Sequence, residues 1–333
     1  MRSAGFQIVM VTALLMAQPV FGAGFLKSCA EVLGIWIQSP SVTDSRINEF
    51  LPQFHRTHAD AWANLVPEPP EAASGLTTEQ ALEMLRGLRD KSGLTWGATK
   101  YVNPAWGNVT WFVPMGTSRA IIKTNQQRTA MTGEKVVTFM NSVRYEVLAF
   151  VLDRYLGTNL VPPAVLLDPG RVAVLYTPGN ATGFGSFSAW PRNLVHATHI
   201  RFIDALVSNG DRDAPGNLVV SAQGNPVAID FDLSRPYYRW QGFNSGMEYV
   251  TRGMLLDPSR RFGRFGPISG VASRRVVDKI QNLDELTLVK IAKEHGLHLS
   301  ENEIANVLGS AKYVLYTLSQ WEKRYGESNV YVP

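Results

Sequence analysis

Between residues 96 and 175 the chain consists of short aromatic and β-branched runs separated by glycine, proline and asparagine, which is typical of strands. Only one segment of that stretch, residues 142–155, has the spacing of a helix, and Gly157 is suited to end it. From about residue 195 the pattern becomes mainly helical, with one strand pair within residues 218–229. A β-rich half with a single helix, followed by a helical half with an embedded hairpin, predicts an α+β fold of two lobes with a cleft between them.

Composition excludes several classes of protein. With 333 residues, 45% hydrophobic and 18% charged, the chain is too apolar to be disordered and long enough for a large core. The formal net charge of +4 and the lack of any run of five Lys or Arg argue against nucleic-acid binding. The sequence contains no uninterrupted apolar run of about 18 residues, so no internal transmembrane helix is expected.

Cysteine and histidine give little support to a metal centre built on nitrogen or sulfur. The single cysteine, Cys29, excludes an intramolecular disulfide and a cysteine-based zinc cluster. His196 and His199 are three residues apart on a predicted helix, and no third well-spaced ligand accompanies them. We therefore expect these histidines to be structural or exposed.

Residues 1–22 resemble a secretory signal peptide. Arg2 provides a short positive region, an apolar stretch runs to Met16, and the small residues Val20 and Gly22 precede a cut before Ala23. A buried helix that stays attached is the alternative. The pattern predicts a protein exported to the periplasm or secreted, including delivery into a host.

Residues 23–95 are predicted to form an N-terminal helical extension. Prolines interrupt the first part of this region, and a helical pattern resumes at Thr77. Thr77 and Gln80 have the spacing of a capping box, and Gly93 is expected to close the helix.

The β-rich lobe is predicted to span residues 96–185. Strands are expected at residues 110–113, 119–123 and 172–176, where β-branched and aromatic residues lie between turn-forming residues. This region is expected to form a sheet against which the single helix packs.

The helical lobe is predicted to span residues 186–333. Two of its helix starts are expected from capping-box spacing, one at Asn282 with Glu285 and one at Ser300 with Glu303.

Polar residues around the predicted hairpin have an arrangement suited to phosphoryl transfer. Asp211 lies in the loop after a helix, Asn217 just precedes a strand, and Asp230 ends the return strand, so their side chains are expected to converge. A carboxylate can orient and deprotonate an acceptor hydroxyl, while an asparagine and an aspartate can hold Mg²⁺ against phosphates. Ordinary turn chemistry is the alternative, because loops commonly use Asn, Asp, Gly and Pro.

A lysine and a glutamate in the β-rich half complete the arrangement. Lys123 ends a predicted strand, and Glu146 lies at the inner edge of the buried stripe of the single helix. A carboxylate that faces a sheet needs a cation, and a strand lysine is the natural partner. Taken singly, each residue is equally compatible with a solvated surface charge.

The order of these residues resembles that of the atypical kinases, which include the secretory-pathway four-jointed kinases, the HipA-type bacterial kinases and the bacterial phosphatidylinositol-kinase-like proteins. The helix and Val-Pro-Pro turn in residues 145–165 look like the corresponding part of the four-jointed kinases. The Asn-Gly-Asp-Arg sequence of residues 209–212 is similar to their catalytic loop. The resemblance covers roughly residues 105–235.

This resemblance implies a two-lobed protein-kinase-like fold and an ATP-dependent phosphotransferase. Lys123 would contact the ATP phosphates, Glu146 would position that lysine, and Asp211 would be the catalytic base. Asn217 and Asp230 would hold Mg²⁺ or Mn²⁺. The acceptor would be a hydroxyl on a protein or on a small molecule.

The sequence also departs from the kinase pattern. Asn217 follows Asp211 by six positions, whereas in the kinase catalytic loop the corresponding asparagine follows the aspartate by five. No G-x-G-x-x-G precedes Lys123, and Asp232 stands where kinases have the glycine of Asp-Phe-Gly. A catalytically inactive pseudokinase that serves as a binding or scaffolding module, and a small-molecule or glycan kinase, therefore remain alternatives.

Overall fold

The computed structural model describes most of the chain from residue 66 onward. The described residues are 66–89, 99–102, 109–132, 135–140, 142–183, 194–209, 212, 216–222, 224–232, 234 and 272–332. The chain divides into residues 1–43 and 44–333, and every described residue belongs to the second unit. The signal-peptide-like segment and the predicted boundaries at residues 22, 95 and 185 lie outside the described residues.

An antiparallel sheet forms the β-rich part of the structure. It has five strands in the order β1-β2-β3-β7-β6. Their bounds are Thr99–Val102 for β1, Val109–Met115 for β2, Ser118–Thr124 for β3, Ala164–Asp168 for β6 and Arg171–Leu175 for β7. The predicted strands at 110–113, 119–123 and 172–176 are thus confirmed, with small shifts at their ends. In the central strand β3, Lys123 pairs with Thr110 of β2 and with Val172 of β7.

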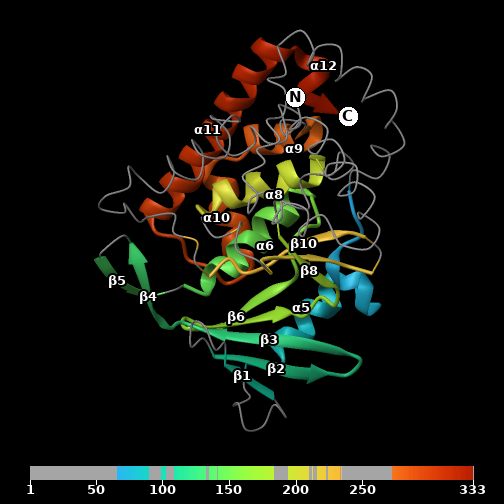
Figure 1. Cartoon of the computed structure of the whole chain (residues 1–333), viewed down its shortest axis with the longest axis vertical. Helices are drawn as coiled ribbons and strands as arrows, with labels where there is room; N and C mark the ends of the chain where they lie inside the picture. Colours follow the sequence, from blue (N-terminus) through green and yellow to red (C-terminus); the bar gives the residue numbers. More distant parts are fainter. Residues whose placement is uncertain are drawn as a thin grey trace, which may run out of the picture. The chain divides into compact units, whose positions relative to one another are not determined.

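Helix α6, which spans Arg144–Leu156, is the predicted single helix of this half. Val143, its N-cap, makes no side-chain cap, and the backbone N–H of Val143 donates to the side chain of Asn125 at 3.0 Å, which attaches the start of the helix to the end of β3. Gly157 ends the helix with φ 70°, the left-handed conformation that glycine adopts without steric cost. The helix contacts β6 and β7 on one side and α8 on the other (Figure 1).

The described part of the predicted extension contains two short helices. A 3₁₀ helix, η1, spans Pro70–Ser74, and α5 spans Thr78–Arg86. The predicted capping box of Thr77 and Gln80 is present. The prediction that Gly93 closes this helix is wrong. The helix ends at Gly87, whose backbone N–H reaches the carbonyls of Glu83 and Leu85 and so completes the last turn.

This extension is attached to the end of α6 by a buried ion pair. Glu71, fully buried in η1, accepts from Nη2 of Arg154 at 3.1 and 2.9 Å. Thr78 donates to the same carboxylate at 2.5 Å. The side chain of Asn159, just beyond α6, donates to the carbonyl of Pro67 at 3.1 Å.

The second half of the described chain is mainly helical, as predicted. Its helices are α8 (Leu194–Leu206), α9 (Arg274–Gln281), α10 (Glu285–Glu294), α11 (Glu301–Tyr325) and α12 (Glu327–Val330). Figure 1 shows α6 between the five-stranded sheet and α8. None of the helices among the described residues is both long and apolar enough to cross a membrane.

One of the two helix starts predicted in this half is correct. Ser300 and Glu303 form a capping box at the start of α11. The predicted box of Asn282 and Glu285 is wrong, because Asp284 caps α10 by accepting from the N–H of Thr287 at 2.8 Å. Asn282 instead ends α9, and both its backbone N–H and its side-chain amide donate to the Asp278 carbonyl. The cap goes to Asp284 because it lies directly before the helix and carries a full negative charge at the positive end of the helix dipole.

The predicted hairpin is part of a second small sheet. Strands β9 (Leu218–Val220) and β10 (Pro226–Ala228) pair antiparallel, and β8 (Asn180–Thr182) joins the other edge of β9. The N–H of Ala228 donates to the Leu160 carbonyl at 2.7 Å, which ties β10 to the turn after α6. The hairpin is therefore fixed against the helix that carries Glu146.

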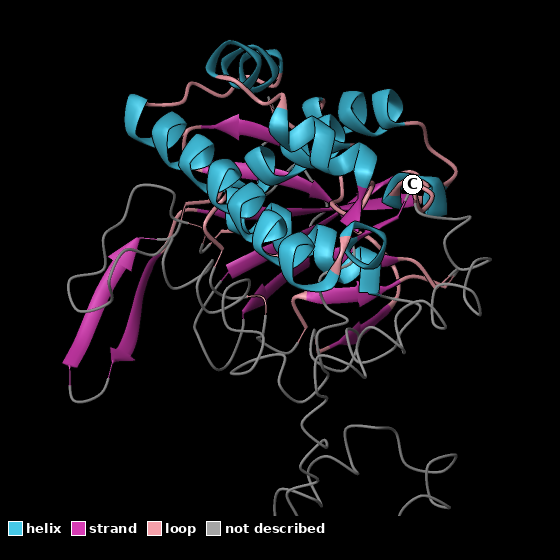
Figure 2. Cartoon of the chain, turned by 90° about the horizontal axis from the view of Figure 1, so that it is seen from above, coloured by secondary structure: helices cyan, strands magenta, loops and turns pink. Residues whose placement is uncertain are grey.

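Two further strand pairs complete the described structure. Strands β4 (Gln127–Thr132) and β5 (Lys135–Met140) form a hairpin of their own, which stands apart from the other strands in Figure 2. Strands β11 (Ala272–Ser273) and β12 (Tyr331–Val332) pair in parallel and join the start of α9 to the end of the chain.

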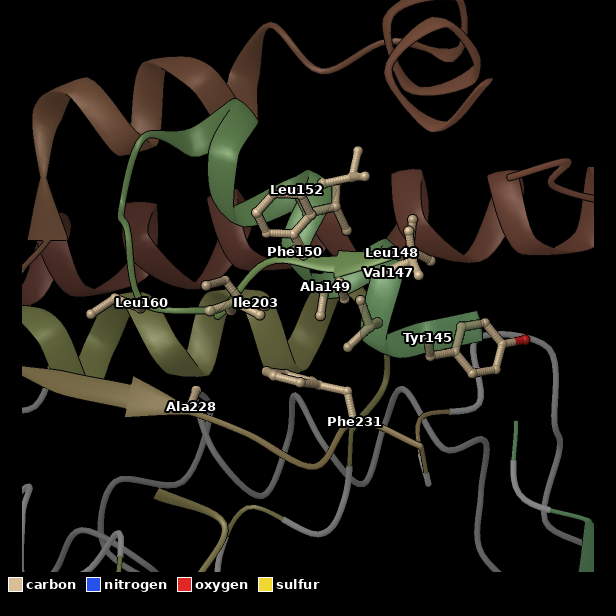
Figure 3. Packing of buried hydrophobic residues seen from close by; sticks show 14 of the residues in the cluster. Tyr145, Val147, Leu148, Ala149, Phe150, Leu152, Leu160, Ile203, Ala228 and Phe231 are labelled. Carbon is tan, nitrogen blue, oxygen red and sulfur yellow. The ribbon is translucent and has the colours of Figure 1, made fainter. Parts of the chain in front are cut away.

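The hydrophobic core is continuous from the sheet through α6 to the helical half. Figure 3 shows two residues of this cluster, Phe231 and Ile203, beside helix α6. The helix contributes aromatic side chains such as Phe150 to the same cluster. Phe231 is fully buried and follows Asp230 directly in the chain. The core therefore anchors the loop that carries one of the predicted site residues.

Candidate functional site

The ammonium group of Lys123 lies between two carboxylates. Its Nζ is 2.5 Å from Oε1 of Glu146 and 2.7 Å from Oδ1 of Asp230. The three residues come from strand β3, helix α6 and the turn after β10. The ion pair between Lys123 and Glu146 that the sequence predicts is confirmed, and Asp230 joins it.

Burial and the neighbouring carboxylates shift the pKa of Lys123 in opposite directions. The side chain is 17% exposed, and burial by itself lowers the pKa of an ammonium group. The carboxylates of Asp230, Glu146 and Asp232 outweigh that effect and raise the pKa of Lys123 above its ordinary value. Lys123 is therefore charged across the physiological pH range.

Two hydrogen-bond donors fix the carboxylate of Glu146. The carboxylate is 2% exposed, and its Oε1 accepts from Lys123 and from the backbone N–H of Phe231 at 3.0 Å. Because Glu146 lies in the first turn of α6, its negative charge also suits the positive end of the helix dipole. Its carboxylate thus links the sheet, the helix and the loop after the hairpin.

Asp230 occupies a constrained turn. Its φ of 65° lies in the left-handed region, which few residues other than glycine adopt without cost. Its side chain is 32% exposed, so one part of the carboxylate pairs with Lys123 while the residue remains accessible to solvent. The chain directly after Asp230 is fixed, since Phe231 is buried in the core and the Asp232 carbonyl accepts from the N–H of Ser142 at 2.9 Å.

Asn217 lies at the start of β9, opposite the end of β10. It is 7% exposed, and its carbonyl accepts from the N–H of Ile229 at 3.2 Å. Ile229 immediately precedes Asp230, so the backbones of the two predicted metal ligands are joined by this bond. Asp211, the predicted base, lies outside the described residues.

The donor set of the two predicted metal ligands fits Mg²⁺ or Mn²⁺. Asn217 and Asp230 offer only oxygen ligands, which these hard cations prefer. Among the described residues, no group of three or more His, Cys, Asp or Glu side chains could hold a metal ion by itself. Because Mg²⁺ commonly takes only one or two carboxylates from a protein, Asn217 and Asp230 could hold such an ion together with further oxygen ligands from outside the chain.

The structure adds a buried charge cluster to which sequence reasoning assigned no role. Arg212, fully buried, donates to the carboxylate of Asp204, also fully buried, and its guanidinium lies 4.6 Å from the ring centre of Phe231. The sequence carried one signal for this cluster, because Asp204 is a charged residue within the otherwise apolar end of α8.

Comparison with known proteins gives structural matches only. Neither a protein-family model nor a curated protein matches the chain. A structure of hydra Fam20 with sugar is 11% identical, covers 77% of this chain and 92% of its own, and has a TM-score of 0.48.

The Golgi casein kinase gives the better superposition. Its crystal structure is 12% identical with a TM-score of 0.51, and the match covers 77% of this chain and 80% of that one. The structure of the same kinase with Mn/ADP bound gives 12% identity and a TM-score of 0.51, with 76% and 79% covered. At such low identity the likeness concerns the fold alone, and this protein has a kinase-like α+β fold, similar to that of the Golgi casein kinase.

Proposed function

We propose that this protein is an ATP-dependent phosphotransferase that moves the γ-phosphoryl group to a hydroxyl acceptor on a protein. The observation that carries the proposal is the contact of Lys123 with both Glu146 and Asp230. A buried lysine between two carboxylates, supplied by a strand, a helix and a post-hairpin turn, is the arrangement with which kinases bind phosphates and metal.

Each residue has a separate task in this proposal. Lys123 binds phosphate oxygens of ATP, and Glu146 keeps its ammonium group in position. Asn217 and Asp230 hold Mg²⁺ or Mn²⁺, and the Golgi casein kinase structure with Mn/ADP bound supports the use of a nucleotide together with a metal. The cation, when bound, neutralises the charge of the phosphates.

Asp211 serves as the base in the transfer. Its carboxylate accepts the proton of the acceptor hydroxyl, whose oxygen forms a bond to the γ-phosphorus. The bond between the γ-phosphorus and the oxygen that bridges to the β-phosphate breaks, and ADP leaves with that electron pair. Each phosphorylated acceptor therefore consumes one ATP.

A nucleotide-binding module without turnover is the second candidate. The extra residue between Asp211 and Asn217, and the lack of a glycine-rich sequence before Lys123, favour it. In that case Lys123, Glu146 and Asp230 would still bind a nucleotide with metal, and only transfer would be missing.

The test is nucleotide binding and phosphate transfer by the full chain. Isothermal titration with ADP should show binding that depends on Mn²⁺ or Mg²⁺. Asp230→Ala should abolish the metal-dependent part of this binding, because it removes the carboxylate ligand. Asp211→Ala should keep the binding and lower transfer from ATP by roughly 10²–10⁴-fold, the usual contribution of a general base.

Asp168→Ala is the matched control. Asp168 pairs with Arg171 at the edge of the sheet, so its loss removes a carboxylate away from the site and should change neither measurement. Wild-type protein that binds no nucleotide would refute the proposal. Binding without transfer to any hydroxyl acceptor would favour the second candidate.

We also propose that the protein is exported, on the basis of residues 1–22. Cleavage before Ala23 would remove this segment, which contains only one charged residue, Arg2. The intact mass of secreted protein should correspond to a chain that begins near Ala23. Soluble protein that begins at Met1 would contradict this.

A further inference from the structure

Arg212 is the largest fully buried side chain among the described residues. An arginine with no exposed surface must have its guanidinium satisfied, since an unpaired buried charge is strongly destabilising. The guanidinium of Arg212 contacts a carboxylate on helix α8 and two backbone carbonyls beside the proposed metal ligands.

One edge of the guanidinium is neutralised by a carboxylate. Nε of Arg212 lies 3.2 Å from both carboxylate oxygens of Asp204, and Nη2 lies 3.0 Å from Oδ1. Asn209 donates to the same Oδ1 at 2.9 Å. Nη1 of Arg201 lies 3.8 Å from Oδ2 of Asp204, so this one carboxylate is shared by two buried arginines.

The other edge of the guanidinium joins the two backbones that carry the proposed ligands. Nη1 donates to the carbonyl of Ile229 at 2.7 Å and to the carbonyl of Asn217. Asn217 is one proposed ligand, and Ile229 directly precedes the other, Asp230. Both carbonyl oxygens carry partial negative charge, and a shared cationic donor holds them close together with charge-assisted hydrogen bonds.

Arg212 contacts the two carbonyls at the end of the hairpin where Asp230 lies. The N–H of Ile229 donates to the Asn217 carbonyl, and beyond this point the chain turns into the left-handed conformation of Asp230. Arg212 thus fixes the two strands where the ladder ends and the ligand-bearing turn begins. The ring of Phe231, 4.6 Å from the guanidinium, holds the far side of the turn.

We propose that Arg212 is the positioning residue that sets the distance between the metal ligands Asn217 and Asp230. This inference rests on the proposed function, because it assigns Arg212 a role only if these two residues hold Mg²⁺ or Mn²⁺. The role requires arginine, since the planar fork contacts a carboxylate on one edge and two carbonyls on the other, which a lysine cannot do.

The test is the Mn²⁺ dependence of ADP binding in the full-length Arg212→Lys protein. Lysine keeps the charge opposite Asp204 and loses the bridge between the two carbonyls. We expect half-saturation of ADP binding to require at least tenfold more Mn²⁺ than in the wild type, with saturating Mn²⁺ restoring the binding. ADP binding measured without metal should be unchanged.

Arg154→Lys is the matched control. Arg154, whose side chain is 17% exposed, also pairs with a buried carboxylate, Glu71, and donates to a backbone carbonyl, that of Val161. Its substitution should lower the melting temperature and leave the Mn²⁺ requirement as in the wild type. A purely structural role for Arg212 predicts the same result for Arg212→Lys, and that result would overturn the inference.

A second variant covers the case in which Arg212→Lys does not fold. The double substitution Asp204→Asn with Arg212→Gln removes the charges of this pair together and avoids a carboxylate without Arg212, at the cost of the 3.8 Å contact of Asp204 with Arg201. It should show the same raised Mn²⁺ requirement, and an unchanged requirement would overturn the inference. Wild-type protein that binds no ADP at any Mn²⁺ concentration would instead refute the proposed function itself.

Discussion

Lys123 is the counter-ion of two carboxylates that the chain supplies from distant positions. Glu146 is 23 residues and Asp230 107 residues further along the chain. Because Glu146 is almost completely buried, its negative charge has no access to bulk water that could replace the lysine. The residue proposed to bind phosphate therefore also stabilises the fold.

We predict that Lys123→Met lowers the free energy of unfolding by about 3–5 kcal/mol at pH 7, because it leaves the buried carboxylate of Glu146 without its cation. The loss should shrink at acidic pH, where Glu146 takes up a proton and becomes neutral. Urea denaturation of wild type and variant at pH 7 and pH 5 measures both effects.

The double variant Lys123→Met with Glu146→Gln is the control for this prediction. It removes the lysine and the buried charge together, so it should be more stable than Lys123→Met alone. Equal stability of the two proteins would show that Glu146 was not the residue left unpaired.

His199 is a buried residue whose charge affects stability. Its Nε2 accepts from the backbone N–H of Ser273 at 3.1 Å, so this nitrogen carries no proton. Burial lowers the pKa of His199 from 6.5 to about 3, and the positive charges of His196 and Arg275 add to that shift. The pair His196 and His199 thus includes a structural histidine, as expected from the sequence.

This depressed pKa predicts a loss of stability in acid. Between about pH 6.5 and pH 3 the unfolded chain binds a proton at His199 and the folded chain does not, so stability falls as pH falls through this window. The loss should reach about 2 kcal/mol at pH 5. His199→Gln can accept the same hydrogen bond without titrating, and its unfolding free energy should depend less on pH. An unchanged pH dependence would contradict the assignment.

At the scale of elements, Glu303 has two tasks at the start of α11. Its carboxylate accepts from the N–H and hydroxyl of Ser300 at 2.8 Å, which completes the capping box. It also accepts from the hydroxyl of Tyr145 at 3.0 Å, in the first turn of α6. The longest described helix is thereby attached at its first turn to the helix that carries Glu146.

We predict that Ser300→Ala costs about 1 kcal/mol, the usual value of a helix cap. Glu303→Ala should cost more, about 2–3 kcal/mol, because it also leaves the buried Tyr145 hydroxyl without this partner. Thermal unfolding of both variants, with Thr77→Ala at the exposed capping box of α5 as control, gives the comparison. Equal losses for Ser300→Ala and Glu303→Ala would argue against a contribution from the Tyr145 bond.

Elements with clear local signals could be predicted from the sequence. The helix before Gly157, the hairpin around residue 223 and the strand that carries Lys123 all have unambiguous periodicity and end signals. Strands β6 and β8 were not predicted, since β6 is a short apolar run that fits helix or strand and β8 is only three residues long. Two helix boundaries were predicted wrongly, each where two suitable capping residues compete. Gly87, and not Gly93, ends α5, and Asp284, and not Asn282, begins α10.

The part of the site that could be predicted is the part in which a residue's charge determines what kind of partner it needs. A carboxylate on the inner edge of a buried helix requires a cation, and this requirement connects Glu146 to Lys123. The role of Arg212 could not be predicted, because its partners at residues 217 and 229 are backbone carbonyls, which every residue possesses. Only the folded hairpin identifies them.

At the scale of the whole molecule, the extension before residue 90 is an integral part of the fold. The buried carboxylate of Glu71 pairs with Arg154, and α5 contacts strands β6 and β7. We predict that Glu71→Gln lowers the free energy of unfolding by about 3 kcal/mol, as expected for a buried pair that loses one partner. Urea denaturation should show a single transition for both proteins.

Glu83→Gln is the matched control, because Glu83 is exposed on α5 and its charge has bulk water around it. Its effect should stay within about 0.5 kcal/mol. If Glu71→Gln costs no more than Glu83→Gln, the extension is not held by the buried pair.

The ion pair of Glu71 and Arg154 also has a consequence for the order in which the chain folds during synthesis. Arg154 leaves the ribosome 83 residues after Glu71, which at about 5–20 residues per second means a delay of several seconds. During that time Glu71 has no arginine to pair with, and the extension must wait for α6. The nascent chain should therefore protect residues 78–86 from protease only after residue 154 has emerged from the exit tunnel.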